Sequence, residues 1–324
     1  LEFRSILGSN VLQHKQNLFL PGSINNNLPI AFVETNRNTF WSIENYLTYN
    51  KEINENNSIT ALLGVSWQQS DFEYLEARAN ALPSDAIKTH NLNSASNQFT
   101  FSSKNRKALN SFFTRINYNL MNKYLFTFTG RADGSSVFGG NNKYSFFPSA
   151  AFAWKVSEED FLLDSSSISN LKLRASYGLT GNSDIPPYSS LGVLNSSYYG
   201  IFNESRFGGT GLGTLSNPNL RWEQTAQYDI GFEIGLFDNR ISIEADYYYR
   251  KTIDMLLNSP VPRSSGYSTI RKNIGSMENK GLELSVSTRN ISTADLTWNT
   301  MFNISGNRNK VLELATPADI FYVG

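Results

Sequence analysis

The feature that most constrains the fold is an alternation of apolar and polar side chains with a period of two residues. Tyr124, Phe126 and Phe128 share one parity, whereas Thr127 and Thr129 share the other. Successive side chains of a β-strand point to opposite faces, so this period predicts strands with one apolar face, and helical spacing fits the runs less well. The alternation recurs in further runs, which include the positions 59–67, 112–120, 144–156, 171–177, 228–236, 241–249, 282–286 and 298–304.

The length of these runs and the order of the connections both indicate a membrane barrel. Most runs last about 10 to 14 residues, longer than a globular strand of about 5 or 6, and roughly 9 to 11 tilted residues cross a bilayer core. Short connections near 51–57, 121–122, 238–239 and 291–294, with a longer one at 158–169, alternate with long polar ones near 71–106, 132–143, 181–222 and 252–278. Outer-membrane barrels alternate short periplasmic turns with long external loops in this way.

Composition removes several other classes of protein. The 324 residues include 28 Lys and Arg against 28 Asp and Glu, and no Cys. Zero net charge gives no basic surface for nucleic acid, and the absence of Cys excludes disulfides and thiolate metal sites within this sequence. No window approaches the roughly 18 apolar residues of a membrane helix. The first residues do not form a signal peptide, so we expect an internal segment of a longer protein.

One hairpin allows the prediction to be made residue by residue. A two-residue turn at Asp238-Asn239 would place Leu236 opposite Ile241 and continue with apolar pairs as far as Tyr228 opposite Tyr249. The other face would then set Glu233 against Glu244, which is unfavourable in a dry core. We expect a water-filled lumen in which an Arg or Lys from a neighbouring strand neutralises them. A metal or catalytic pair is less favoured, because no His or third acid lies nearby in the sequence.

Five segments resemble one family in the same order along the chain. They are GRADGSSVFGGNNKYSFFPSAAFAWKVSEEDFL, ISNLKLRASYGLTGN, NPNLRWEQTAQYDIGFEIGLFDNRISIEADYYYRKTIDMLL, NIGSMENKGLELSV and NISGNRNKVLEL. Together they resemble the SusC/RagA family of TonB-linked outer-membrane transporters of Bacteroidota. The resemblance covers residues from about 107 to 314. Val137 departs from the family, which often has a basic residue there.

The resemblance implies an all-β fold, a membrane-spanning antiparallel β-barrel of which this chain is part. We count about ten to eleven strands, the first of them partial at residues 1–8, of a family-typical 22-stranded barrel. Residues 1–324 are expected to form part of the barrel domain, with the N-terminal plug, the TonB-engaging segment and the C-terminal strands outside this sequence. Alone, such a part would leave unpaired sheet edges and would neither close nor transport.

The family also implies a function and partners. It implies TonB-dependent import of a nutrient, a glycan or peptide oligomer, across the bacterial outer membrane, without enzyme activity or a cofactor. The implied partners are a SusD-like surface lipoprotein, the TonB-ExbB-ExbD complex through the missing N-terminal region, outer-membrane lipid and the substrate. Nucleic acid is not among them.

Strand parity supplies candidate site residues, because polar side chains between lipid-facing ones point into the lumen. Their ordinary role is ion pairing and solvation between strands, which we favour over direct substrate contact. The lumen-facing candidates are Arg115, Arg131, Asp133, Lys155, Lys172, Arg174, Asp229, Glu233, Glu244, Asp246, Glu283 and Arg289. Aromatic residues of the long 181–222 connection either stack on substrate or pack their own loop; they are Tyr188, Tyr198, Tyr199, Phe202 and Phe207.

No catalytic, cofactor or metal site is predicted. GGTGLG at 208–213 lacks the Lys-Ser/Thr of a phosphate-binding loop, and His14 and His90 have no neighbouring ligand pattern. Two alternatives stay open: a secreted soluble β-sandwich or propeller that binds glycans, and a non-transporting outer-membrane barrel such as an adhesin or enzyme. The first predicts polar outer faces, and the second predicts catalytic residues or a barrel that closes within this sequence.

Overall fold

The computed structural model describes residues 1–202 and 205–314, with the backbone alone for 196–202 and 205–207. In this part of the chain the regular structure consists of β-strands and short 3-10 turns, without an α-helix. None of its helical segments is long or apolar enough to cross a membrane. The structure therefore confirms the all-β fold that the two-residue period predicted.

Eleven strands form one antiparallel sheet in the order β1-β2-β3-β4-β5-β6-β7-β10-β11-β14-β15. Neighbours in the sheet are therefore neighbours among these strands in the chain, which is the meander of an up-and-down barrel wall. The strands are β1 (Glu2–Leu20), β2 (Ile30–Asn54), β3 (Asn57–Asn80), β4 (Asn97–Leu120), β5 (Tyr124–Ser135), β6 (Tyr144–Lys155), β7 (Ile168–Asn182), β10 (Glu223–Leu236), β11 (Ile241–Ile253), β14 (Ser276–Ser292) and β15 (Thr297–Glu313).

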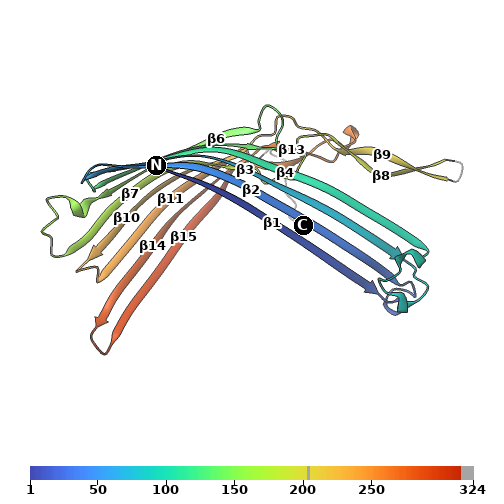
Figure 1. The fold of residues 1–324 in the computed structure, drawn as a ribbon, viewed down its shortest axis with the longest axis horizontal. Helices are drawn as coiled ribbons and strands as arrows, with labels where there is room; N and C mark the ends of the chain where they lie inside the picture. The colour runs from blue at the N-terminus through green and yellow to red at the C-terminus, as the bar shows by residue number, and fades with distance from the viewer. Residues whose placement is uncertain (203–204, 315–324) are drawn as a thin grey trace. The chain divides into compact units, whose positions relative to one another are not determined.

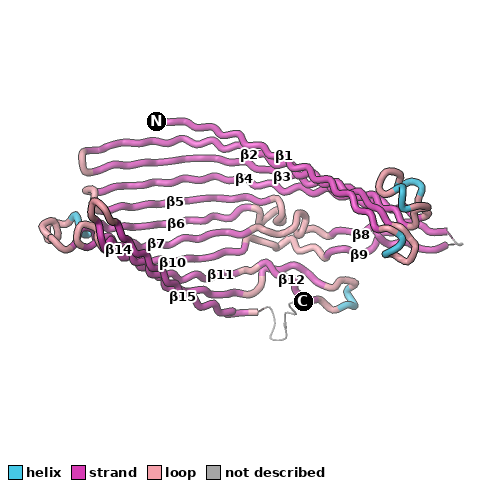
Figure 2. Tube along the Cα trace, turned by 90° about the horizontal axis from the view of Figure 1, so that it is seen from below, coloured by secondary structure: helices cyan, strands magenta, loops and turns pink. Residues whose placement is uncertain are grey.

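Two long connections fold into hairpins of their own. The connection between β7 and β10 contains β8 (Val193–Phe202) and β9 (Ser205–Thr214), and that between β11 and β14 contains β12 (Leu256–Pro260) and β13 (Thr269–Asn273). Figures 1 and 2 show the two hairpins at the same end of the sheet strands β7, β10, β11 and β14. The 3-10 turns are η1 (Gly22–Ile24), η2 (Asp85–Ile87), η3 (Leu92–Ser94), η4 (Val156–Glu158) and η5 (Arg263–Ser265).

The chain divides into two units. Unit 1 consists of residues 1–4, 46–65 and 111–324, and unit 2 of residues 5–45 and 66–110. Unit 2 has a small buried core of Ala31, Ala79, Leu82 and Ala95, with Phe19, Ile87 and Leu92 packed against it. Unit 1 contains the sheet from β5 onward and both hairpins.

The predicted β10–β11 register is correct at each residue. Leu236 pairs with Ile241, Tyr228 with Tyr249 and Glu233 with Glu244. Asp238 and Asn239 each have φ of +56°, and the amide of Arg240 donates to the carbonyl of Phe237 at 3.1 Å. Positive φ at both central residues defines the type I′ turn that matches the twist of a two-residue hairpin.

One face of the unit 1 sheet is apolar and open. Ile230 is 65% exposed and Leu282 58% exposed. Aromatic rings form a cross-strand ladder on this face, with Tyr177 and Tyr228 centroids 4.7 Å apart and Tyr228 and Tyr249 6.4 Å apart. A sheet that exposes this much apolar surface on one side, and charges on the other, fits lipid outside and water inside.

The expected strand lengths are wrong for the first four strands. β1 has 19 residues instead of a partial strand at 1–8, and β2, β3 and β4 have 25, 24 and 24. Only 81–96 of the expected 71–106 connection lies outside the strands. Polar side chains occupy both faces of this region, as in the Glu73–Lys104 ion pair on one face and the Tyr74–Glu76 hydrogen bond on the other. The ladder of backbone hydrogen bonds continues there although the apolar alternation has ended.

Candidate functional site

Six charged side chains lie on one face of four neighbouring strands in unit 1. This charged cluster consists of Lys172 and Arg174 on β7, Glu233 on β10, Glu244 and Asp246 on β11, and Glu283 on β14. Four carboxylates against two cationic groups leave the cluster with a net negative charge. All six were predicted to face the lumen from parity alone.

Arg174 is the centre of the charged cluster. Its Nη2 lies 2.7 Å from Glu244 Oε1 and 3.0 Å from Asp246 Oδ1, and its Nε lies 3.2 Å from Glu233 Oε1. Lys172 Nζ lies 3.3 Å from the same Glu233 oxygen. The structure thus confirms the expectation that a basic residue of a neighbouring strand neutralises the facing Glu233 and Glu244. The side chain of Arg174 is 32% exposed, so these pairs are only partly shielded from water.

Gly231 makes room for the contact between Arg174 and Asp246. In the register Gly231 of β10 lies directly between Arg174 of β7 and Asp246 of β11. A Cβ atom at this position would meet the carboxylate of Asp246. The missing side chain therefore leaves an opening through which Asp246 reaches across β10 to Arg174.

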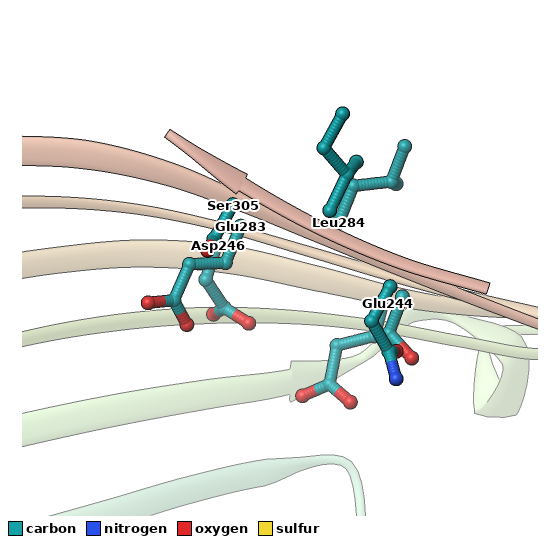
Figure 3. A pocket seen from close by; sticks show the side chains of 8 residues that line it. Glu244, Asp246, Glu283, Leu284 and Ser305 are labelled. Atoms are coloured by element: carbon teal, nitrogen blue, oxygen red, sulfur yellow. The ribbon is translucent and has the colours of Figure 1, made fainter. Parts of the chain in front are cut away.

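A hollow of about 410 Å³ adjoins the acidic half of the charged cluster. Figure 3 shows the carboxylates of Glu244, Asp246 and Glu283 on one side of the sheet and Leu284 on the other. Ser305 of β15 completes this wall together with Ser285 and Asn303. Carboxylates, hydroxyls and an amide around open space favour water and cationic or hydroxyl-rich groups.

The other predicted residues form smaller groups. Arg131 donates to Asp133 Oδ1 at 2.7 Å and to Ser111 Oγ at 2.8 Å, with Asp133 only 8% exposed. Arg115 donates to Thr129 Oγ1 at 3.3 Å. Asp229 accepts from Ser176 Oγ at 3.0 Å. These partners belong to the protein, which agrees with ion pairing and hydrogen bonding between strands as the ordinary role.

Three further predicted residues are not members of the charged cluster, although Lys155 borders it. Lys155 lies opposite Lys172 in the β6–β7 register, and Arg289 lies opposite Asn299 in β15. Tyr188 has φ of +65° and is 42% exposed in the connection before β8. The side chains of the other loop aromatics, Tyr198, Tyr199, Phe202 and Phe207, lie outside the described part of the chain.

A buried aromatic core at the end of β5–β7 was not predicted as a structural group. This rim core is built on the rings of Phe138, Phe147 and Trp222, together with the buried Val137 and Leu220 beside them in the sequence; all five are at most 6% exposed. The Trp222 ring lies 5.3 Å from that of Phe138 and 5.4 Å from that of Phe147, and its Nε1 donates to the carbonyl of Lys143 at 2.9 Å. These residues come from two of the segments quoted in the sequence analysis. The order of those segments indicated the family, but it did not predict that the two segments touch.

A second unpredicted group surrounds Glu159 at the opposite, short-turn ends of the strands. Glu159 accepts hydrogen bonds from Tyr124 Oη at 2.7 Å, Trp154 Nε1 at 3.0 Å and Lys123 Nζ at 3.1 Å. The hydrogen bonds from Tyr124, Trp154 and Lys123 lower the pKa of Glu159. The carboxylate of Glu159 in turn raises the pKa of Lys123. An aromatic pair with polar tips at a strand end is typical of the interfacial girdle of a membrane barrel.

The described residues contain no group of three or more His, Cys, Asp or Glu side chains arranged to hold a metal ion. The charged cluster is held together by Arg174 instead. Its net negative charge gives this face a potential that favours cationic groups.

Comparison with known proteins gives the family. The model for the TonB-dependent receptor-like β-barrel matches residues 6–313. TonB-dependent receptor P3 of Formosa agariphila is 44% identical over 279 residues, which are 86% of this chain and 28% of that protein. TonB-dependent receptor SusC of Bacteroides thetaiotaomicron is 39% identical over 221 residues, 67% of this chain and 22% of SusC.

A solved structure agrees. The RagAB peptide transporter matches 96% of this chain with a TM-score of 0.86 and 28% sequence identity, over 35% of the RagAB chain. The chain therefore spans between about a fifth and about a third of the length of these relatives. The chain belongs to the family of TonB-dependent receptor β-barrels of the outer membrane, and within it to the SusC/RagA type.

Proposed function

We propose that this chain forms part of the wall of a receptor that imports a nutrient oligomer, a glycan or a peptide, across the outer membrane in a TonB-dependent manner. The observation that carries the proposal is the two-sided sheet of unit 1. One face is apolar and open, and the other bears the charged cluster beside a hollow of about 410 Å³. A wall of this kind separates lipid from a watered path.

The proposed partners are a SusD-like surface lipoprotein, which would meet the external loops, and the TonB-ExbB-ExbD complex, which would act through regions outside this sequence. The likeness to SusC and to the RagAB peptide transporter supports both. Because RagAB is described as a peptide transporter and this chain is 28% identical to it, peptides stand beside glycans as proposed cargo.

Of the alternatives, a soluble sandwich or propeller does not match the eleven-stranded meander. A non-transporting barrel makes a different prediction from an importer. It predicts binding of oligomers at the cell surface without accumulation inside the outer membrane, and without dependence on energy.

Uptake by the full-length receptor tests the proposal. Cells that carry the receptor would be offered fluorescent glycan and peptide oligomers too large for porins, with and without a proton uncoupler, and beside a strain that lacks TonB. We expect one oligomer class to accumulate in the periplasm, and the uncoupler or the loss of TonB to abolish accumulation while surface binding stays. Accumulation that persists without TonB, or binding without accumulation, would contradict the proposal.

A further inference from the structure

The rim core also joins the roots of two external connections. Trp222 and Leu220 belong to the segment between β9 and β10, whereas Val137 and Phe138 belong to the β5–β6 connection. The fit is close, since a Cβ atom at Gly139 would meet the carbonyl oxygen of Pro218. Asn142 Nδ2 also donates to that oxygen at 3.5 Å.

Arg221, between Leu220 and Trp222, ties the same segment to the β12–β13 hairpin. Its guanidinium makes a two-point ion pair with Asp254, with Nη2–Oδ1 at 2.7 Å and Nε–Oδ2 at 3.0 Å. Its backbone amide donates to Asn273 Oδ1 at 2.9 Å, and its carbonyl accepts from Asn273 Nδ2 at 2.7 Å. Asp254 and Asn273 lie at the two feet of this hairpin, so one residue fixes both.

Two more contacts join the β8–β9 and β12–β13 hairpins to each other. Asn217, just after β9, donates from Nδ2 to the carbonyl of Arg271 in β13 at 2.8 Å. Farther out, Leu212 of β9 lies against Gly266, whose φ of +82° and lack of a side chain admit it. The hairpins therefore share one hydrogen bond at the root and one contact farther out.

Contacts that hold the two hairpins in place before a ligand binds affect the free energy of binding. Ordering a flexible backbone costs conformational entropy. A loop that is already ordered before its ligand arrives does not lose that entropy on binding, so it binds more tightly. The connection between β7 and β10 is long and rich in glycine, which raises the entropy cost of ordering it. The contacts at its root restrict that freedom.

We propose that Trp222 and Arg221 are positioning residues that hold the β8–β9 and β12–β13 hairpins as a single external arm, and that this arm captures the oligomeric cargo at the mouth of the barrel. The inference rests on the proposed function for its cargo, a glycan or peptide oligomer. The bracing itself rests only on the contacts above.

Spin labels on the two hairpins test the bracing. Thr210 and Ser264 are both exposed, and this sequence contains no Cys. The full-length receptor, with Thr210→Cys and Ser264→Cys as its only cysteines, would be labelled in outer-membrane vesicles. We expect a narrow distribution of label-to-label distances, and at least a doubling of its width in Trp222→Ala and Arg221→Ala. Trp298→Ala, which alters an exposed tryptophan of β15, should leave the width unchanged.

Uptake kinetics test the role in capture. In Trp222→Ala and Arg221→Ala, we expect the half-saturating oligomer concentration to rise about tenfold while the maximal uptake rate stays unchanged, because a disordered arm weakens only the encounter. A receptor damaged throughout would instead lose heat-modifiable mobility and maximal rate together. Arg221→Ala leaves the rim core side chains intact, so it carries the test if Trp222→Ala does not insert.

The outcomes separate the two proposals. Unchanged distances in Arg221→Ala would overturn the bracing, and broadened distances with unchanged half-saturation would overturn the role in capture. Weaker lipoprotein co-purification with unchanged half-saturation would also overturn capture, because the arm would then serve docking. If the parent receptor accumulates none of the oligomers while the distances broaden as expected, the proposed function fails and the bracing stands.

Discussion

The rim core and the charged cluster lie in the same unit of the sheet, but they hold their strands in opposite ways. Trp222 is 5% exposed and packs against the rings of Phe138 and Phe147. Arg174 is 32% exposed and is surrounded by carboxylates. Burial of apolar surface is insensitive to salt, whereas partly exposed ion pairs are screened and contribute little each. The rim core therefore fixes the structure, while the charged cluster leaves a wet and adjustable surface.

Removing the centre of the rim core should have the largest effect. In Trp222→Ala we expect the free energy of unfolding to fall by about 3–5 kcal/mol, because the change leaves a cavity and removes one of the two hydrogen bonds to the carbonyl of Lys143. Urea unfolding of the full-length receptor in lipid vesicles measures this. Trp298→Ala, at a site that is 56% exposed, should cost clearly less. Equal losses in the two variants would contradict the contrast between a buried anchor and an exposed one.

Removing the centre of the charged cluster should have a smaller effect, and one that depends on salt. We expect Arg174→Met to lower the free energy of unfolding by about 1–2 kcal/mol, because Glu233 and Glu244 then face each other without the guanidinium. The loss should shrink as salt is raised from 0.05 to about 1 M, since the repulsion is screened. The Trp222→Ala loss should not shrink. A further Glu244→Gln change should restore part of the lost stability, and a loss that is independent of salt would argue against repulsion as its cause.

The opening at Gly231 gives a finer test of the charged cluster. An alanine in a strand normally stabilises relative to glycine by roughly 0.5–1 kcal/mol. At Gly231 the new Cβ would displace the Asp246 carboxylate from Arg174, whereas a Cβ at Gly306 meets nothing within 4 Å. We expect Gly306→Ala to stabilise the full-length receptor, and Gly231→Ala to give no gain or a loss. Equal gains at both positions would show that Arg174 does not need the opening.

The Glu159 group should give the smallest effect, visible as a dependence on pH. The pKa of Glu159 lies below its ordinary value of 4.5, so the group stabilises the fold above that value and loses this contribution as pH falls through the lowered pKa. The pKa of Lys123 is raised, so its contribution is lost only above about pH 10.5. We expect Glu159→Gln to flatten the fall in melting temperature between about pH 5 and 3. If the melting temperature of Glu159→Gln falls with acid as steeply as that of the parent, other carboxylates cause the fall.

The sequence allowed much of unit 1 to be predicted. The β10–β11 register followed from one turn and one apolar period, because a shift by one residue would turn each apolar side chain of the hairpin to the wrong face. The six members of the charged cluster followed from parity. The hub position of Arg174 did not, since it depends on the Gly231 opening and on strands that are distant in sequence.

The lengths of β2–β4 were underestimated for a different reason. The alternation of apolar and polar residues marks only the part of a strand that has one apolar face. Where both faces carry polar side chains the alternation ends, but the backbone hydrogen bonds between the strands continue. The folding of the long connections into β8–β9 and β12–β13 was likewise hidden, because short polar hairpins lack an apolar period.

The sequence by itself determined the class of fold, the apolar and polar faces, the family, and the pairing of neighbouring strands, because all of these depend on the period of side chains and on local turns. Only the tertiary structure decided that Trp222, Phe138 and Phe147 meet, and that Arg221 reaches both Asp254 and Asn273. These contacts join segments that are far apart in the chain, and their distances are set by how the strands place the loop roots.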